Sequence, residues 1–498
     1  MYYPSQPEFL KLAGQGNLIP VTRRVLADFE TPLSAYRKIR GQGESFLFES
    51  VEGGEHIGRY SFVGCNPRSV IRQTGTRVEV IENGKVTETF TIGQGVTDGL
   101  AVIEQVMKRF QPVSIPGLPR FSGGAVGFIG YEFIHDIEPV VPRPPRDDLN
   151  TPTLYFLIAD ELLVFDRVSQ TITILVNAVL NGQSPEDAYE EATGEIDRLL
   201  SLLEQPLEFL PADVPREIPD VPFASNMTQE KFVENVERAK KYISAGDIIQ
   251  VVGSQRFSTP VKASPIDIYR AARSINPSPY MFLLELDGFS LVGASPEVHV
   301  RCEDRRVEIR PIAGTTRRGK TEAEDEALEK ELLANPKERA EHVMLVDLAR
   351  NDIGRVCNFG SVRVKDLMII ERYSHVMHIV SQVEGTLSAK RNAYDLMRAT
   401  FPAGTLSGAP KIRAMQIISE MEQTARGTYG GCVGYFSFNG NLDCCITIRT
   451  ALIKEGVAYV QAGGGWVYDS VPEAEFQETV NKSKAMLKAV AMAENFYQ

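Results

Sequence analysis

The chain has 498 residues, of which 43% are hydrophobic and 24% charged, and its formal net charge is −12. This length allows two or three ordinary domains or one large intertwined domain. The acidic balance argues against nucleic acid as a partner, and a small anionic ligand would need local cations or a metal ion. The six cysteines form no CxxC motif and no disulfide framework, which is typical of a reducing cytosol.

The sequence contains no membrane or secretion signal. Its N-terminus lacks a basic segment followed by an apolar core, so we expect no signal peptide. The most apolar stretch, residues 154–165, is interrupted by Asp160 and Glu161 and is too short to span a bilayer. We therefore expect a cytoplasmic protein without a membrane partner.

The N-terminal region, residues 1–205, alternates between strand-like and helix-like segments. Residues 206–225 contain five prolines and no periodicity, which predicts a linker. The C-terminal region, residues 226–498, opens with a helix from Thr228 that ends at Gly246. We predict strands at 45–50, 60–64, 171–180, 248–258 and 281–286, a strand with a loop at 287–300, and a helix at 186–203 preceded by Ser184-Pro185.

Two glycine-rich segments resemble each other. GGAVGFIGYE at 123–132 and GGCVGYFSFN at 430–439 both predict strands that other backbone approaches closely. The similarity could reflect two packed sheets of related design, or it could be chance. Because strands and helices follow without a regular βαβ alternation, we expect an α+β fold.

Two glutamate pairs, Glu338/Glu341 and Glu475/Glu478, share the spacing i and i+3, which places both carboxylates of a pair on one helix face. Asn335-Pro336 predicts an N-cap and first helical residue before the first pair. Before the second pair, residues 470–473 predict a capping box, with Pro472 in the first turn.

Four carboxylates on two facing helices would repel one another unless a cation lay between them. Oxygen ligands without His or Cys at zinc spacing favour a hard ion such as Mg²⁺. Two alternatives stay open at this point. The pairs could be solvated helix faces, and Glu338 could serve the helix N-terminus beside Asn335.

Two glycine-rich segments add candidate anion contacts. Residues 401–411, FPAGTLSGAPK, predict a constrained loop whose backbone N–H groups face an anion, although the order of a P-loop is absent. Residues 462–470, AGGGWVYDS, lead directly into the second glutamate pair. Their three glycines would let a carboxylate approach the backbone, but structural turns also explain most glycine triplets.

Three side chains in other segments are further candidates. His375 and His378 could form a metal pair, or one histidine could act as a proton donor. Arg449 stands in an apolar segment, ITIRT, that predicts a strand with an anionic partner for the arginine.

Five long segments together resemble the signature blocks of the chorismate-utilising enzymes, and most closely the anthranilate synthase component I group. They are NPKERAEHVMLVDLARNDIGRV, RYSHVMHIVSQVEG, FPAGTLSGAPKIRAM, RGTYGGCVGYF and AGGGWVYDSVPEAEFQETVNKSKA. The resemblance covers almost the whole chain and is strongest over 226–490. It implies two large packed antiparallel β-sheets flanked by helices, an αββα sandwich.

The resemblance also implies the ligands of a metal and a substrate. Mg²⁺ would be held by Glu341 and Glu478, with Glu338 and Glu475 reaching it through water. The substrate would be chorismate, a dianion. His378 matches the family's general acid and Thr405 a residue of the ring pocket. The positions matching substrate contacts are Tyr429, Arg449, Gly463, Gly464, Gly465, Lys482, Gly314 and Thr315.

Two positions distinguish the reactions of the family. Water-using relatives carry a lysine base where this chain has Gln250, and aminodeoxychorismate synthases carry a lysine nucleophile where it has Ala313. Neither residue can perform the lysine's role. The resemblance therefore implies conversion of chorismate and ammonia to anthranilate and pyruvate in tryptophan biosynthesis. The alternatives are aminodeoxychorismate synthase component I and a catalytically silent, tryptophan-binding regulatory homologue.

The N-terminal region resembles that of feedback-inhibited members. FLFES at 46–50 and NPSPYMF at 276–282 match blocks that bind L-tryptophan, which implicates Glu49, Ser50, Pro279, Tyr280 and Met281. A plain core strand is the alternative for the first block. No nucleophile elbow for glutamine hydrolysis is present, so we expect a separate glutamine amidotransferase subunit, component II, as the source of ammonia.

Overall fold

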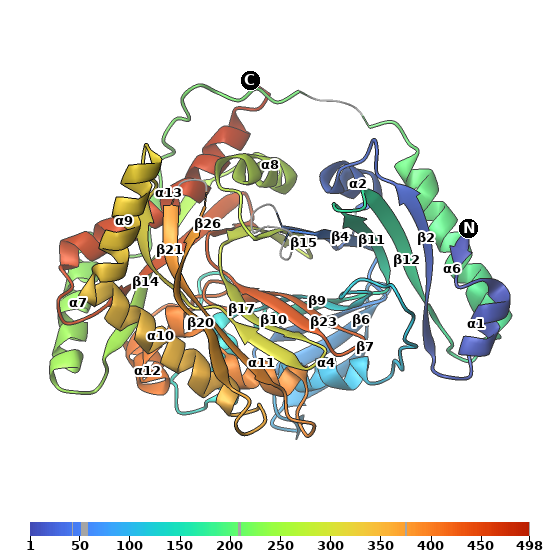
Figure 1. Cartoon of the computed structure of the whole chain (residues 1–498), viewed down its shortest axis with the longest axis horizontal. Coiled ribbons are helices and arrows are strands. Elements are labelled where there is room, and N and C mark those ends of the chain that lie inside the picture. The colour runs from blue at the N-terminus through green and yellow to red at the C-terminus, as the bar shows by residue number, and fades with distance from the viewer. Residues whose placement is uncertain (42, 51–57, 208–210, 374–375, 498) are drawn as a thin grey trace.

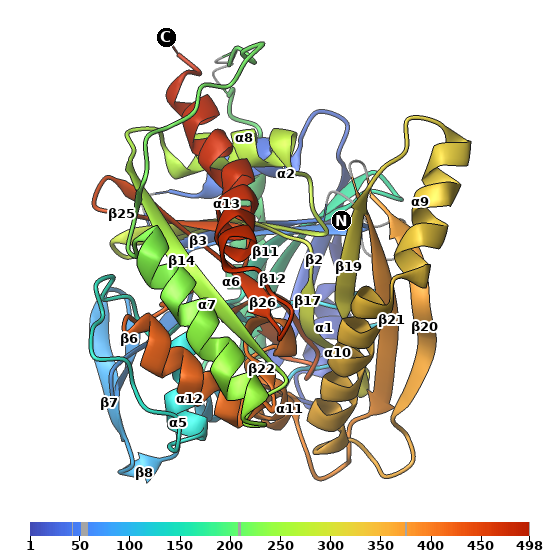
Figure 2. The same cartoon turned by 90° about the vertical axis from the view of Figure 1, so that its left-hand side faces the viewer.

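Two large β-sheets lie face to face between outer layers of helices (Figures 1 and 2). The computed structural model describes residues 1–41, 43–50, 58–207, 211–373 and 376–497. Within these residues each sheet has 13 strands, and all ladders are antiparallel except the one between β7 and β8. The predicted α+β sandwich is therefore confirmed.

Sheet A contains the first strand, β1, and the last strand, β26, of the described chain. Its strands, in spatial order, are β1 (Tyr2–Tyr3), β2 (Leu18–Leu26), β12 (Thr171–Val179), β11 (Glu161–Asp166), β4 (Tyr60–Cys65), β3 (Ser45–Glu49), β15 (Tyr280–Leu286), β16 (Phe289–Ser295), β25 (Thr450–Lys454), β26 (Val457–Trp466), β14 (Gln250–Pro260) and β13 (Ala224–Ser225), with β22 (Gly408–Ala409) beside β14.

Sheet B lies against sheet A. Its strands, in spatial order, are β19 (Ile312–Arg317), β21 (Val376–Thr386), β18 (Arg306–Ile309), β17 (Val298–Glu303), β24 (Leu442–Ile446), β23 (Cys432–Ser437), β9 (Gly124–Ile129), β10 (Leu154–Ala159), β5 (Ser69–Thr74), β6 (Arg77–Glu82), β7 (Lys85–Ile92) and β8 (Gly95–Val96), with β20 (Arg363–Arg372) beside β21.

Helices cover the outer faces of both sheets. Sheet A packs against α2 (Pro32–Ile39), α6 (Pro185–Leu203), α8 (Pro265–Ile275) and α13 (Pro472–Glu494), while α1 (Gln6–Leu12) rests on α6. Sheet B packs against α4 (Gly99–Met107), α9 (Glu322–Ala334), α10 (Pro336–Gly354) and α11 (Ala393–Thr400); α7 (Gln229–Ser244) and α12 (Lys411–Glu422) pack on β14. The short helices are η1 (Tyr131–Phe133), α5 (Ile134–Ile137) and η2 (Gly404–Leu406). In the described part of the chain, none of the helices is long and apolar enough to cross a membrane.

The sheet interior explains why these segments became strands. Large apolar side chains from both sheets, including Phe46, Phe62, Phe128, Leu157 and Leu284, form one buried cluster between them. Two further clusters fill the space between each sheet and its helices. Burial on both faces is why β9 and β10 are apolar at every position rather than alternating.

Strands from both sides of the predicted linker occur in each sheet. Strand β3 pairs with β15 in sheet A, and β9 pairs with β23 in sheet B. The two similar glycine segments therefore lie side by side in one sheet, with Gly127 opposite Gly434, and the idea that they represent two sheets is wrong. A Cβ at Gly127 would lie 1.9 Å from the Tyr155 carbonyl oxygen, so close backbone approach does explain the glycine.

Candidate functional site

The first glutamate pair lies on α10, whose start was predicted correctly. The Asn335 side chain accepts hydrogen bonds from the backbone N–H groups of Lys337 and Glu338, and Pro336 is the first helical residue. This cap orients the first turn of α10 toward sheet strands β19 and β21, which the helix contacts.

The second pair lies on α13, but the predicted capping box at 470–473 is wrong. The residue at the cap is Val471, whose side chain makes no capping bond, and the helix begins at Pro472. The Ser470 hydroxyl instead donates to Glu475 Oε1 at 2.7 Å and accepts from the Val467 N–H. The serine thus holds one carboxylate of the pair in place.

The carboxylates of the two helices converge on one region beside β26, which is called the cleft from here on. A Cβ built on Gly464 would lie 3.1 Å from Glu475 Oε2 and 3.5 Å from Glu478 Oε1. Burial raises the pKa of Glu338, and repulsion from Glu341 and, across the helices, from Glu478 raises it further. Burial also raises the pKa of Glu475. In the chain as described, no three His, Cys, Asp or Glu side chains are close enough together to hold a metal, so the carboxylates do not form a closed cage.

Glu341 and Glu478 are each contacted by a nitrogen of another side chain. Gln250 Nε2 donates to Glu341 Oε1 at 3.1 Å, and Lys482 Nζ lies 2.7 Å from Glu478 Oε1. Lys482 also donates to the Gly463 carbonyl at 3.0 Å. Gln250, Lys482 and the two helices therefore surround the same space.

The floor of this space is a strand, so a structural turn, the alternative left open for the three glycines, is not what they form. Gly463, Gly464 and Gly465 lie within β26 and pair with Ser254, Gly253 and Val252 of β14. A Cβ on Gly465 would lie 2.1 Å from Gln250 Nε2, and one on Gly463 would lie 2.6 Å from the Gly253 carbonyl oxygen. The glycines leave room for groups that face the strand.

Sheet B supplies the opposite wall. Thr315 of β19 pairs in register with His378 of β21, and Thr315 Oγ1 lies 2.8 Å from His378 Nδ1. Burial lowers the pKa of His378, and the nearby Arg449 lowers it further, while a hydrogen bond with the Gly314 backbone raises it. The imidazole is therefore neutral at pH 7. His375 lies outside the described residues, so the histidine metal pair stays a prediction.

Arg449 does not lie in a strand, contrary to the prediction. It occupies a bend between β24 of sheet B and β25 of sheet A, with a left-handed φ of 52°. Burial lowers its pKa, and the nearby Tyr429 and Glu478 raise it. The bend arises because the chain crosses here from one sheet to the other, and it brings the guanidinium beside the buried Tyr429 ring.

Glu297 was missed by the sequence reasoning. It lies at the crossing between β16 and β17 and is only 8% exposed. Burial raises its pKa to about 8, and the Thr405 hydroxyl and the Ile312 backbone counteract this rise. Glu297 and Thr405 line one cavity with Ala403, Gly404 and Ile446. A lone carboxylate in the stretch 288–300 was the signal that could have revealed it.

A second pocket lies between the sheets. All five residues predicted to contact tryptophan line it: Glu49, Ser50, Pro279, Tyr280 and Met281. Glu49 is 3% exposed and accepts a hydrogen bond from Tyr269 Oη at 2.6 Å. Arg301 donates to Tyr280 Oη at 2.8 Å, and Tyr280 Oη donates to Asp443 Oδ1 at 2.8 Å. The pocket thus has apolar walls and charged ends.

The fold and these features define a class: an αββα protein in which two carboxylate-bearing helices lie beside a glycine-rich strand. The comparisons with known proteins agree. The model of the chorismate binding enzyme family matches residues 44–488. The chain is 48% identical to anthranilate synthase component 1 of Acetivibrio thermocellus, with 99% of both chains covered.

Two further relatives show the same similarity. The identity to anthranilate synthase component 1 of Pseudomonas putida is 49%, covering 98% of this chain and 99% of that one. The crystal structure of anthranilate synthase component I from Streptococcus pneumoniae TIGR4 superposes with a TM-score of 0.77 at 36% identity, covering 93% of this chain and 99% of that one. The chain belongs to the family of chorismate binding enzymes.

Proposed function

We propose that this enzyme converts chorismate and ammonia to anthranilate and pyruvate in tryptophan biosynthesis. Within the family, Gln250 is the residue that favours ammonia over water as the nucleophile. Its amide lies in the cleft against Glu341 and Gly465, so the position has no base that could activate water. Ala313 of β19 likewise offers no amine for a covalent adduct with the ring. Ammonia therefore attacks the ring directly.

The donor set of the cleft fits Mg²⁺. It consists of carboxylate oxygens from two helices, and the space beside them at Gly464 would be filled by any Cβ. Glu341 and Glu478 would contact the ion, with Glu338 and Glu475 behind water molecules. When bound, Mg²⁺ would orient the ring carboxylate and stabilise its charge.

The remaining residues bind the substrate and move a proton. The β26 glycines admit the ring carboxylate to the backbone, and Arg449, Tyr429 and Lys482 surround the enolpyruvyl carboxylate. Ammonia forms a C–N bond at ring carbon 2 while the 4-hydroxyl leaves as water after protonation. Loss of the proton at carbon 2 and of the enolpyruvyl group as pyruvate then gives the aromatic ring. His378 and Glu297 are the candidate proton donors for the hydroxyl.

The reaction is tested by incubating the purified chain with chorismate, Mg²⁺ and an ammonium salt. We expect fluorescent anthranilate and one pyruvate for each anthranilate. Formation of an aminated ring without pyruvate would support an aminodeoxychorismate synthase instead. If no chorismate is consumed, the proposal fails and the silent regulatory homologue is favoured.

We also propose a separate amidotransferase subunit that supplies ammonia from glutamine in the cytoplasm. The support is the numbered name of the relatives, component 1, together with the lack of a nucleophile elbow in this sequence. Glutamine-dependent anthranilate formation by the chain mixed with a component II subunit is the expected result. Activity with ammonium but never with glutamine would contradict it.

The pocket between the sheets fits L-tryptophan as a feedback inhibitor. The Glu49 carboxylate can accept from the ammonium group, and Pro279, Tyr280 and Met281 form an apolar wall for the indole. Ser50→Phe fills the pocket, so we expect the concentration of tryptophan for half-inhibition to rise while kcat is retained. Thr74→Phe, at the exposed end of β5, adds the same bulk outside the pocket and should leave inhibition unchanged.

A further inference from the structure

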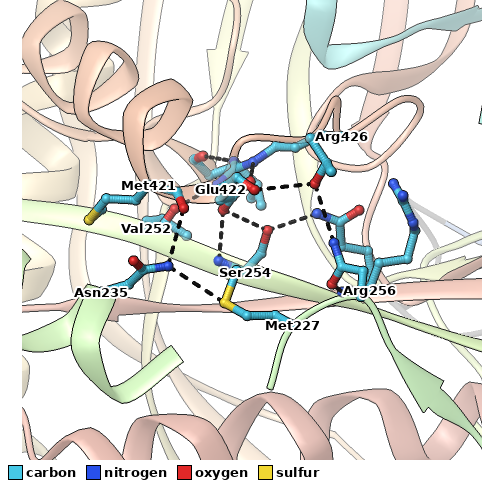
Figure 3. A network of polar contacts seen from close by, with 12 residues as sticks. Met227, Asn235, Val252, Ser254, Arg256, Met421, Glu422 and Arg426 are labelled. Carbon is cyan, nitrogen blue, oxygen red and sulfur yellow. Dashed lines mark hydrogen bonds and ion pairs between the residues drawn. The ribbon is translucent and has the colours of Figure 1, made fainter. Parts of the chain in front are cut away.

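A buried ion pair lies behind the cleft, outside the groups assigned above. Glu422 ends α12, and Arg426 follows in the segment that leads to Tyr429 (Figure 3). Their side chains are 5% and 2% exposed, and the guanidinium binds the carboxylate through two bonds, Nη2 to Oε1 at 2.6 Å and Nε to Oε2 at 2.8 Å. This two-point geometry fixes both planes.

The pair also binds the backbone of two segments that form the cleft. Arg426 donates to the Leu406 carbonyl at 2.8 Å and to the Val252 carbonyl at 2.7 Å. Glu422 Oε1 accepts from the Ser254 N–H at 2.8 Å and from its hydroxyl at 2.9 Å. Leu406 follows Thr405, while Val252 and Ser254 pair with Gly465 and Gly463.

Tyr429 is held by the same group. The guanidinium carbon lies 5.6 Å from the centre of the Tyr429 ring and 4.6 Å from that of Tyr131, within range of cation–π attraction. Glu132 accepts from the backbone N–H groups of Arg426 and Gly427 at 2.8 and 3.0 Å, which fixes the chain just before Tyr429. A Cβ on Gly463 would lie 2.7 Å from the Tyr429 hydroxyl.

Stability alone gives little reason for such a pair. Desolvation of two charges offsets most of their attraction, and well-packed apolar residues often replace a buried pair without loss of stability. Apolar residues could not, however, hold three backbone groups and a ring at fixed distances. The contribution of this pair is therefore to fix the relative positions of these groups.

We propose that Arg426 and Glu422 are positioning residues for the substrate site. Together they set the relative positions of the Thr405 turn, the β14–β26 floor and the Tyr429 ring. This inference rests on the proposed function for its kinetic consequence, because those three parts are assigned to chorismate binding.

The test uses the full chain with Glu422→Gln and Arg426→Lys. Each keeps a polar side chain of similar length but loses the two-point geometry. We expect kcat/KM for chorismate to fall about a hundredfold, because displacements of about 1 Å in a site have that effect. Ser254→Ala removes the hydroxyl that donates to Glu422 and accepts from Gln461 Nε2 at 2.8 Å, but it keeps the Ser254 N–H bond to Glu422 and the ion pair itself. It should therefore fold even if the others do not, and it should raise KM.

Asp98→Asn is the matched control. Asp98 forms a two-point pair of the same geometry with Arg398, at 2.8 and 2.9 Å, at the start of α4, where the Asp98 side chain is 4% exposed and that of Arg398 is 22% exposed. We expect Asp98→Asn to lower the unfolding midpoint and to leave KM unchanged. If the role of Arg426 and Glu422 is purely structural, their variants and Ser254→Ala should show the same two results. If the wild-type chain converts chorismate and KM is unchanged in both Ser254→Ala and Glu422→Gln, the positioning role is wrong, while the proposed function still holds.

An independent measurement needs no turnover. Trp466, the one tryptophan of the chain, pairs with Val251 and directly follows Gly465. Its ring lies over Gly253, where a Cβ would come within 2.0 Å of it. Displacement of β14 in Glu422→Gln or Arg426→Lys should shift its fluorescence emission, and Asp98→Asn should not. Identical emission in all variants would contradict the inference even if the wild-type chain proved inactive on chorismate.

Discussion

Glu341 and Glu478 contribute charge to the cleft while their positions are fixed by Gln250 and Lys482. An amide keeps the size of each side chain and removes its charge. We expect Glu341→Gln and Glu478→Gln to weaken Mg²⁺ binding by about a hundredfold or more and to abolish turnover, as measured by titration calorimetry and anthranilate fluorescence. Glu473→Gln, exposed on the same helix as Glu478, is the control, and an equal effect there would disprove the assignment.

Glu297 and His378 differ in the pH at which each would lose its proton. The Glu297 pKa is about 8 because of burial, whereas that of His378 lies below its usual value of 6.5. If Glu297 is the donor, kcat/KM should fall above pH 8 when free ammonia is held constant, and Glu297→Gln should cost about 10² to 10⁴-fold. A fall that begins below pH 6.5 would indicate His378.

The same carboxyl affects stability. The unfolded chain releases this proton near pH 4.5 but the folded protein retains it to about pH 8, so the free energy of unfolding falls as pH rises through that interval. Glu297→Gln removes this loss. Its unfolding midpoint should therefore exceed that of the wild type by more at pH 8 than at pH 5, and a constant difference would mean that Glu297 is ionised in the folded protein.

Some site residues were predictable because their signals are local. The i and i+3 spacing of the glutamates identified both helices, and Asn335, Ser184 and Thr228 cap their helices as expected. The bend at Arg449 and the burial of Glu297 were not predictable. Both lie where the chain crosses between sheets, and the groups around them come from distant segments.

At the scale of elements, β26 shows how tertiary contacts override local preference. A triple glycine suggests a turn, yet here it continues a strand because β14 pairs with all three residues. Ser470 shows the same effect at α13. Its hydroxyl binds Glu475 rather than the helix end, so a local capping pattern failed where a site contact competes.

Adjacent glycines of β26 should respond differently to alanine. A Cβ at Gly463 meets the Gly253 carbonyl at 2.6 Å, which must move the backbone, whereas one at Gly464 first meets the movable end of Glu475 at 3.1 Å. We expect Gly463→Ala to lower the free energy of unfolding by about 1–3 kcal/mol in chemical denaturation. Gly464→Ala should leave stability near wild type and weaken Mg²⁺ binding. The reverse order would contradict the role of the strand as the floor of the cleft.

At the scale of the molecule, neither sheet belongs to one half of the chain. Strand β15 needs β3, and β23 needs β9, so residues 226–498 alone would expose the buried edges of two sheets. We expect this fragment to aggregate and to show no cooperative unfolding by circular dichroism. A soluble, cooperatively unfolding fragment would show that the C-terminal region is independent.

The matched control for this fragment is the full chain cleaved at one place in the linker, which keeps all residues. The described residues between 211 and 223 form no helix or strand, so a protease site placed there should be cleaved in the folded protein without separating the pieces. We expect the cut protein to elute as one species with nearly the wild-type unfolding midpoint and activity. Separation of the two pieces would contradict the interleaved sheets.

The pairing of β9 with β23 also delays the folding of the chain during its synthesis. About 300 residues separate the two strands, and at roughly 5–20 residues per second their translation takes on the order of tens of seconds. Throughout that time the apolar strand β9 has left the ribosome but its neighbour β23 has not been made. One edge of β9 is therefore unpaired, which favours aggregation. Folding of this chain therefore begins late, and its yield in a cell should depend on chaperones that shield the first strands until the last arrive.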